Sequence, residues 1–113
     1  MKKYRLGEFE EILMLTVGIL HGNAYGVAIK KEIEARADRK VSVGALQTAL
    51  KRLEQKGYLK AETGEGSQER AGRPKRFYSV TAHGRIALEH NKDLRNELWA
   101  AMSQAILGLK LIQ

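Results

Sequence analysis

The sequence predicts a mainly α-helical protein with one small β-hairpin and a long C-terminal helix. Apolar residues recur at helical spacing in three separate segments before residue 57. Two short strand candidates then flank a basic loop that contains glycine and proline, and the second of them has the aromatic and β-branched character of a strand. The chain contains no proline after Thr81 and keeps an apolar stripe nearly to its end. A chain of 113 residues fits one modest core, and we expect two parts, a domain over residues 1–81 and a helix over residues 82–113.

The first two helices are predicted over residues 7–21 and from about residue 25 to residue 37. The first should be central and largely buried, and Gly22 suits the left-handed residue that ends a helix. Its apolar face consists of Phe9, Ile12, Leu13, Thr16, Ile19 and Leu20, widened by Leu15 and Val17. In the second helix Tyr25, Ile29, Ile33 and Ala37 repeat every four residues, with charged residues on the other side.

A third helix is predicted to begin after Ser42, a good N-cap, and to end at Gly57. Its inward stripe is formed by Leu46, Leu50 and Leu53. The opposite face then consists of Gly44, Gln47, Thr48 and Lys51, with Arg52 on one flank. A helix that enters the DNA major groove needs such a face, because glutamine and threonine can meet base edges and lysine can meet phosphate or guanine. The alternative is an ordinary solvent-facing side of a helix.

Two strands are predicted over residues 58–62 and 77–80, and the loop between them is strongly basic. Its cations are Arg70, Arg73, Lys75 and Arg76. Gly72 and Pro74 suit a tight exposed turn, and Thr81 is a good N-cap for the last helix. One interpretation is a solvated hairpin tip whose charges only keep the protein soluble. The order helix, helix, helix, strand, loop, strand is that of a winged helix-turn-helix, which favours DNA binding with the loop as a basic wing.

The composition points to a polyanionic partner. The chain has 20 Lys and Arg against 13 Asp and Glu residues, a net charge of +7. Nucleic acid is favoured over membrane, because the longest apolar run, residues 12–20, is interrupted and shorter than the roughly 20 residues of a spanning helix. The absence of cysteine excludes disulfides and thiolate metal sites, and the three histidines lack zinc-ligand spacing. We expect a cytosolic protein with no metal and no cofactor.

The last helix is predicted over residues 84–112, which would reach roughly 40 Å. Its apolar stripe consists of Leu94, Leu98, Met102, Ile106, Leu109 and Ile112, with Trp99 beside Leu98. The preceding domain is too small to cover a stripe of this length, so a second copy of the chain is the simplest cover. The alternative is a helix that folds back onto its own domain. We expect a homodimer.

Several separated motifs resemble the PadR family of bacterial transcriptional regulators. They are LGEFEE at residues 6–11, AYGVAI at 24–29, SVGALQTALKRLEQKGYL at 42–59 and GRPKRFYSVTAHGR at 72–85. The resemblance implies a dimeric, repressor-like protein that binds a palindromic DNA site. It also implies that Tyr25, Ser42, Gly44, Gln47, Thr48 and Lys51 lie at or near DNA and that Arg73, Lys75 and Arg76 form the wing. Family members usually carry tyrosine where this chain has Gln47, so contacts at that position could differ.

The length of the chain is similar to the shorter branch of that family, in which one C-terminal helix carries out dimerisation. The resemblance implies that this helix packs against its partner and against the first helix of the other subunit, which would include Phe9 and Leu13. In some short-branch members a tryptophan of this helix flanks a pore on the dimer axis that accepts flat hydrophobic molecules. Trp99 is therefore a candidate for binding a small hydrophobic effector, or else it simply fills the dimer interface.

Three functional classes remain after these observations. The first is a sequence-specific transcription factor, the second a sequence-tolerant nucleic-acid or chromosome-organising protein, and the third a winged-helix module for protein interaction. We do not expect an enzyme, because the sequence has no nucleophile, base and orienter constellation and no glycine loop that would cradle phosphate.

Overall fold

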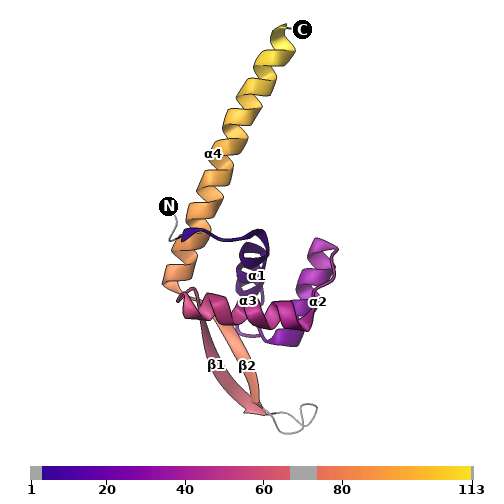
Figure 1. The fold of residues 1–113 in the computed structure, drawn as a ribbon, viewed down its shortest axis with the longest axis vertical. Coiled ribbons are helices and arrows are strands. Elements are labelled where there is room, and N and C mark those ends of the chain that lie inside the picture. Colours follow the sequence, from indigo (N-terminus) through magenta and orange to yellow (C-terminus); the bar gives the residue numbers. More distant parts are fainter. Residues whose placement is uncertain (1–3, 67–73, 113) are drawn as a thin grey trace.

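The computed structural model describes residues 4–66 and 74–112, which form four helices and one hairpin (Figure 1). In chain order the elements are α1 (Glu8–Ile19), α2 (Gly26–Ala37), α3 (Val43–Gln55), β1 (Leu59–Gly66), β2 (Pro74–Val80) and α4 (Ala82–Ile112). The predicted class, mainly α with a small hairpin and a long last helix, is confirmed. The predicted helix ends agree with the observed ones to within two residues, and differences of this size are usual where helices fray.

Helices α1, α2 and α3 pack around one apolar core that the start of α4 and the base of the hairpin complete. The largest side chains that are fully buried are Leu13, Met14, Val17, Ile29, Ile33, Leu46, Leu50, Leu53 and Tyr58. The leucine stripe predicted on α3 therefore does point inward. Helix α1 is less enclosed than expected, because Leu15 and Ile19 on its outer side are 50% and 52% exposed.

The hairpin is antiparallel and regular near its base. Leu59 pairs with Val80 and the register continues to Thr63 and Arg76, after which a bulge precedes the pair of Gly66 and Pro74. The prediction that Pro74 lies in a tight turn is wrong, because the strand extends to include it at its first position, where its missing N–H costs least. Gly72 lies outside the described residues.

The segment that precedes α2 is attached to the hairpin. The Tyr78 N–H donates a hydrogen bond of 2.8 Å to the Ala24 carbonyl, and Tyr25 forms an isolated antiparallel bridge with Phe77. These contacts connect α2 with β2, so the helix-turn-helix and the hairpin share one surface.

Helix α4 begins at a cap and a close packing contact. The Gly84 N–H donates to Thr81 Oγ1 at 2.9 Å, which confirms Thr81 as the N-cap, and the Thr81 hydroxyl donates to the Gly57 carbonyl at 2.6 Å. Gly84 lies so close to the backbone of Tyr58 that a Cβ atom would be 2.2 Å from the Tyr58 carbonyl oxygen. Only glycine allows α4 to start at this depth.

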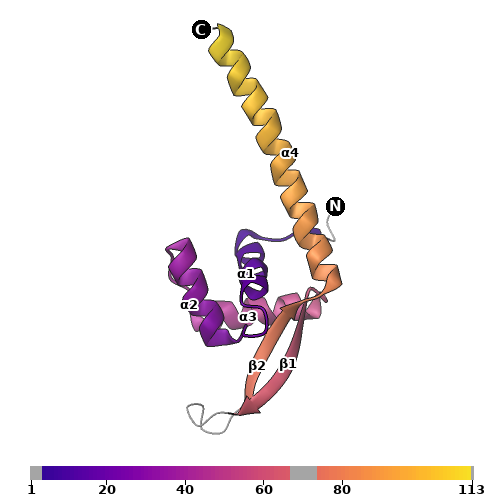
Figure 2. The ribbon, with the colours of Figure 1, turned by 180° about the vertical axis from the view of Figure 1, so that it is seen from behind.

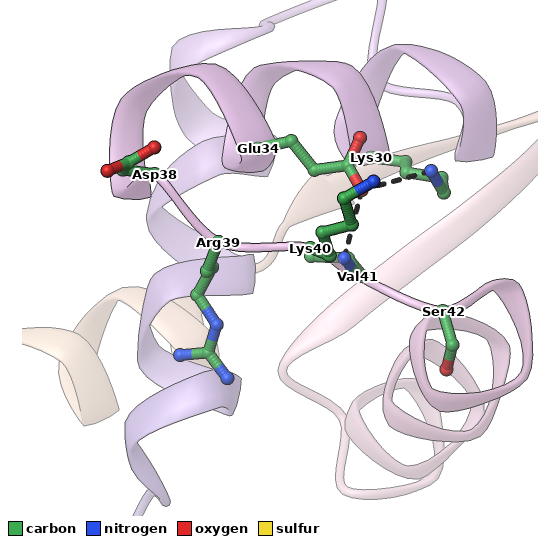
Figure 3. A pocket seen from close by; sticks show the side chains of 7 residues that line it. All are labelled: Lys30, Glu34, Asp38, Arg39, Lys40, Val41 and Ser42. Carbon is green, nitrogen blue, oxygen red and sulfur yellow. Dashed lines mark hydrogen bonds and ion pairs between the residues drawn. The ribbon is translucent and has the colours of Figure 1, made fainter.

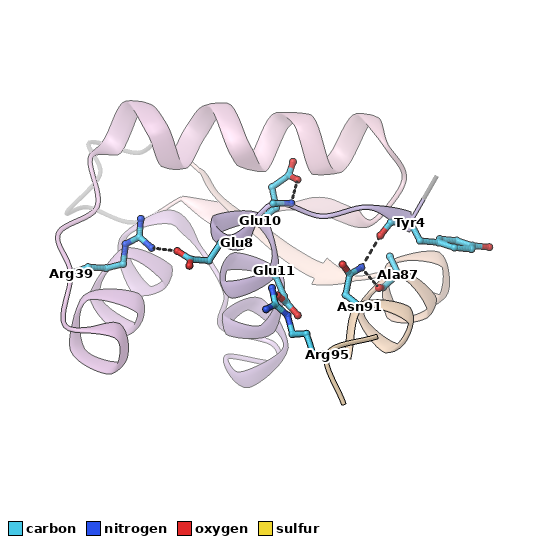
Figure 4. Close-up of polar contacts among 9 residues, drawn as sticks. Tyr4, Glu8, Glu10, Glu11, Arg39, Ala87, Asn91 and Arg95 are labelled. Atoms are coloured by element: carbon cyan, nitrogen blue, oxygen red, sulfur yellow. Dashed lines mark hydrogen bonds and ion pairs between the residues drawn. The ribbon is translucent and has the colours of Figure 1, made fainter. Parts of the chain in front are cut away.

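The rest of α4 projects away from the body of the molecule (Figures 1 and 2). With this helix included, the molecule measures 66 × 28 × 22 Å along its principal axes. Two contacts with the N-terminal part of the chain set its direction (Figure 4). The Asn91 amide donates to the carbonyls of Tyr4 and Ala87 at 2.7 Å each, and Arg95 forms an ion pair of 2.8 Å with Glu11 on α1. In the part of the chain described, no helix combines the length and the apolar character needed to cross a membrane.

Candidate nucleic-acid interface

The outward side of α3 is exposed and polar apart from Val43 at its start, which is 62% exposed. Gly44, Gln47, Thr48 and Lys51 are all exposed on the side opposite to the buried leucine stripe. The Ala45 N–H donates to Ser42 Oγ at 3.1 Å, so Ser42 is the N-cap of the helix, as predicted. Apart from Gly44, its two chain neighbours and the adjacent backbone of α3, no described atom lies within 4 Å of the position that a Cβ of Gly44 would occupy. The first two turns of α3 therefore offer a low surface that another molecule can approach closely.

A hollow separates this part of α3 from α2 and β2. Its volume is about 410 Å³. It is lined by Tyr25, Gly26, Val27, Lys30, Val43, Leu46, Gln47, Arg76 and Tyr78. Gln47 lies on the α2 side of the exposed face, since its Nε2 atom is 3.4 Å from a Cβ placed on Gly26. Its amide is thus near the N-terminus of α2 as well as on the face of α3.

Tyr25 joins the helix-turn-helix to the wing strand. It is the N-cap of α2, and the Lys75 ammonium lies 4.2 Å from the centre of its ring. The ring of Phe77 meets the same ring edge-on, with centroids 5.7 Å apart. Lys75 is therefore held beside the N-terminus of α2, where backbone N–H groups and a cation together favour an anion.

Arg76 has a different environment from Lys75, because successive residues of a strand point to opposite faces. Its guanidinium donates to both carboxylate oxygens of Glu54 on α3, at 2.9 and 3.1 Å. This pairing raises the pKa of Arg76 further above its ordinary value. Arg76 thus connects the wing strand to α3, and its charge is matched by a neighbouring acid.

The remaining predicted basic residues are Arg52, Arg70 and Arg73. Arg52 is exposed on the flank of α3, beside a hollow that it shares with Phe9 and Thr48. Arg70 and Arg73 lie outside the described residues. Sequence reasoning missed two acids that organise the site, Glu54 opposite Arg76 and Glu34 at the turn before α3. The only sequence signal for Glu34 is its spacing of four residues from Lys30.

The residues predicted to form a dimer interface are distributed unevenly between surface and core. On α4, Leu94, Leu98, Met102 and Ile106 are exposed, and Trp99 is 65% exposed. On α1, Phe9 is partly buried beneath the Arg39 guanidinium, 5.5 Å from its ring centre, whereas Leu13 is fully buried in the core of its own chain. The apolar surface that α1 does offer comes from Leu15 and Ile19. The side chain of Leu109 is not described.

No metal centre is formed by the residues that the structure describes, since they contain no group of three or more histidine or acidic side chains placed to hold an ion.

The model of the Transcriptional regulator PadR-like family matches residues 15–90. The chain belongs to this family. A solved PadR-like transcription factor from Bacteroides fragilis is 28% identical, with 92% of each chain covered and a TM-score of 0.73. A PadR family transcription regulator from Clostridium difficile R20291 is 25% identical over 87% of this chain and 98% of the other, with a TM-score of 0.65. No curated protein sequence matches the chain.

The same fold occurs in a protein solved together with DNA. Bacillus subtilis PadR in complex with operator DNA is 17% identical to this chain, with a TM-score of 0.60. The match covers 76% of this chain and 47% of that one. The likeness establishes a shared PadR fold between the two proteins.

Proposed function

We propose that this PadR-like protein is a sequence-specific DNA-binding regulator that acts as a homodimer on a palindromic operator. The observation that carries the proposal is the exposed face of α3, which is polar, capped at its start and low at Gly44. A helix with this face fits the major groove, where Gln47, Thr48 and Lys51 would meet base edges or phosphate. The complex of Bacillus subtilis PadR with operator DNA supports the same use of the fold.

The surfaces beside α3 would fix its position on the duplex. Tyr25, Ser42 and Lys75 lie at helix N-termini or next to one, where phosphate oxygens are favourable partners. Arg52 extends the basic surface along the flank of α3, and we place Arg70 and Arg73 with the wing as phosphate contacts. Arg76 lies on the wing strand, where Glu54 matches its charge. Such contacts supply affinity and register, and α3 supplies specificity.

Dimerisation would proceed through α4. Its exposed apolar stripe lies beyond the reach of the chain's own core and fits a second copy, with Leu15 and Ile19 of α1 as further apolar surface. A two-fold axis would present two α3 helices to successive major-groove faces, which is why the proposed operator is palindromic. Because a bound dimer occupies the duplex that polymerase needs, we propose repression.

An effector would act at Trp99. The ring is largely exposed in the single chain and would approach its twin across a two-fold axis, which suits a flat hydrophobic molecule. Binding there would change the spacing of the two α3 helices and release the operator. Dye titration of the dimer tests this part: quenching of Trp99 fluorescence supports a site, and absence of quenching leaves Trp99 as interface filler.

The experiment that tests the main proposal is selection of duplexes from a random pool, followed by titration of the selected duplex and a scrambled one at several salt concentrations. We expect one palindromic motif and an affinity ratio of roughly 10³ or more between the two duplexes. Equal affinity for both would identify a sequence-tolerant nucleic-acid protein. Failure to bind any duplex at low salt would point to a module for protein interaction.

A further inference from the structure

The turn between α2 and α3 determines the direction in which α3 begins. Asp38 ends α2 in the left-handed region, with φ 49° and ψ 48°, and the chain reaches the cap of α3 four residues later. Within residues 4–66 and 74–112, neither Arg39 nor Lys40 nor Val41 forms a backbone-to-backbone hydrogen bond. Backbone hydrogen bonds of these three residues therefore do not stabilise the turn.

The carboxylate of Glu34 supplies the partner that this backbone lacks. The Val41 N–H donates to Glu34 Oε2 at 2.9 Å, and the Lys30 ammonium donates to the same oxygen at 3.0 Å (Figure 3). Val41 is buried in the core, and the next residue, Ser42, caps α3. One side chain of α2 thus holds the amide immediately before the N-cap of the proposed recognition helix.

We propose that Glu34 is a positioning residue for DNA recognition, which fixes the angle of the first turns of α3 by holding the Val41 amide. This inference rests on the proposed DNA-binding function and names a residue that carries it. The residues whose placement depends on this angle are Gly44, Gln47 and Thr48. An altered angle would misplace base contacts while it leaves most phosphate contacts available.

The charges around Glu34 favour its ionised form. Lys30 on α2 and Lys40 in the turn are the cations that act on it, and the turn also carries Arg39 and Asp38 at the same hollow. The Val41 hydrogen bond, followed by Lys30, holds the pKa of Glu34 below its ordinary value. Because the pKa is lowered on folding, the contact is complete at neutral pH and is lost only as the pH falls through that lowered pKa.

The charge of Glu34 makes the proposal easy to separate from plain electrostatics. Removal of an acid from a DNA-binding protein strengthens binding to every duplex, because the net positive charge increases. Loss of positioning has the opposite effect on the selected duplex alone. Glu32 is a matched control, because it lies on the same helix and pairs with Arg36 one turn further on.

We would titrate the parent chain and the variants Glu34→Ala, Glu34→Gln and Glu32→Gln with the selected duplex and the scrambled one. Glu32→Gln should tighten both complexes slightly. Glu34→Ala should weaken the selected complex about tenfold, the equivalent of one good base contact, without weakening the scrambled one. The affinity of Glu34→Gln for the selected duplex should lie between those of Glu32→Gln and Glu34→Ala, since its amide oxygen can still accept a hydrogen bond from the Val41 N–H.

A second measurement uses no DNA. Hydrogen exchange of the Val41 amide, followed by NMR, should be slow in the parent and in Glu32→Gln and at least about tenfold faster in Glu34→Ala. In the parent, the Val41 amide resonance should titrate in acid with the lowered pKa of Glu34, and this titration should disappear in Glu34→Gln.

The outcomes separate the two proposals. If Glu34→Ala tightens both complexes as Glu32→Gln does, or if Val41 exchanges equally fast in the parent and in Glu34→Ala, the role of Glu34 is overturned while DNA binding stands. A parent chain that binds no duplex overturns the proposed function and this role with it. If Glu34→Ala fails to fold, Glu34→Gln and the parent's titration decide, and a Val41 resonance that does not move in acid overturns the role.

Discussion

Helices α3 and α4 are both amphipathic, yet the chain buries the apolar side of only one of them. On α3, Leu46, Leu50 and Leu53 are at most 1% exposed, whereas on α4 Leu98 and Trp99 are 59% and 65% exposed. The polar side of α3 is left for a partner, and on α4 it is the apolar side. The difference agrees with the two partners proposed above, a polyanion for α3 and the apolar surface of a second copy for α4.

The boundary between a buried and an exposed apolar side lies within α4 itself. Its first two turns are part of the core, with Gly84 against the Tyr58 backbone and Ala87 fully buried. Past Asn91 and Arg95, which contact the N-terminal part of the chain, the helix has an open apolar side. One continuous helix thus connects the core rigidly to the proposed dimer interface.

The largest effect is expected from a substitution that disrupts the packing of the buried start of α4. Gly84→Ala would place a Cβ 2.2 Å from a backbone oxygen that cannot move aside easily, so we expect a loss of at least about 3 kcal/mol in the free energy of unfolding. Gly108→Ala in the same helix is the control, because nothing lies within 4 Å of its Cβ position, and it should stabilise the helix by up to about 1 kcal/mol. Urea denaturation measures both, and equal stability of the two variants would contradict the packing contact.

The second prediction tests the open side of α4. Leu98→Glu with Met102→Lys would place two charges in the proposed dimer interface, so we expect monomers in sedimentation at micromolar concentration and weaker binding to the selected duplex. Asn96→Glu with Ala100→Lys introduces the same charges at the same spacing on the opposite side of α4. This control should remain a dimer. A parent chain that sediments as a monomer would be incompatible with the proposed assembly.

The third prediction sharpens the contrast between a core-facing side and a partner-facing side on α3. Gly44→Ala should raise the free energy of unfolding by roughly 1 kcal/mol, because alanine is the better helix former and no atom obstructs its methyl group. If α3 enters the major groove closely, the same methyl group should weaken binding to the selected duplex severalfold. Thermal unfolding and DNA titration of one preparation give both numbers. A variant that gains stability and keeps its affinity would place Gly44 outside the contact.

Sequence periodicity predicted the elements and the core of the winged helix because local patterns determine them. The spacing of Leu46, Leu50 and Leu53 and the capping residues Ser42 and Thr81 were sufficient to orient α3 and to start α4. The same reasoning wrongly placed Pro74 in a turn. It failed there because strand length at a hairpin tip depends on the partner strand rather than on local residue preference.

Contacts between residues distant in sequence could not be predicted in the same way. The apolar pattern of α1 fits several rotations of the helix, and packing in three dimensions places Leu13 inside and Leu15 outside. The pairs of Arg76 with Glu54 and of Val41 with Glu34 join different elements, so no spacing rule reveals them. The first of these pairs changes which cations are available to bind DNA. Arg76 is paired with an acid, whereas Lys75 is not in an ion pair among the described residues.

The smallest expected effect distinguishes these two neighbouring cations on the partner-facing side. Lys75→Ala removes a charge held over the Tyr25 ring, so the slope of log affinity against log salt should become shallower by about one on any duplex. Arg76→Ala with Glu54→Gln removes a matched pair and leaves the net charge unchanged, so its slope should equal that of the parent chain. Titrations at four or more salt concentrations measure both variants. If the double variant loses as much slope as Lys75→Ala, Arg76 must leave Glu54 and contact phosphate in the complex, and the wing then contributes both cations to DNA.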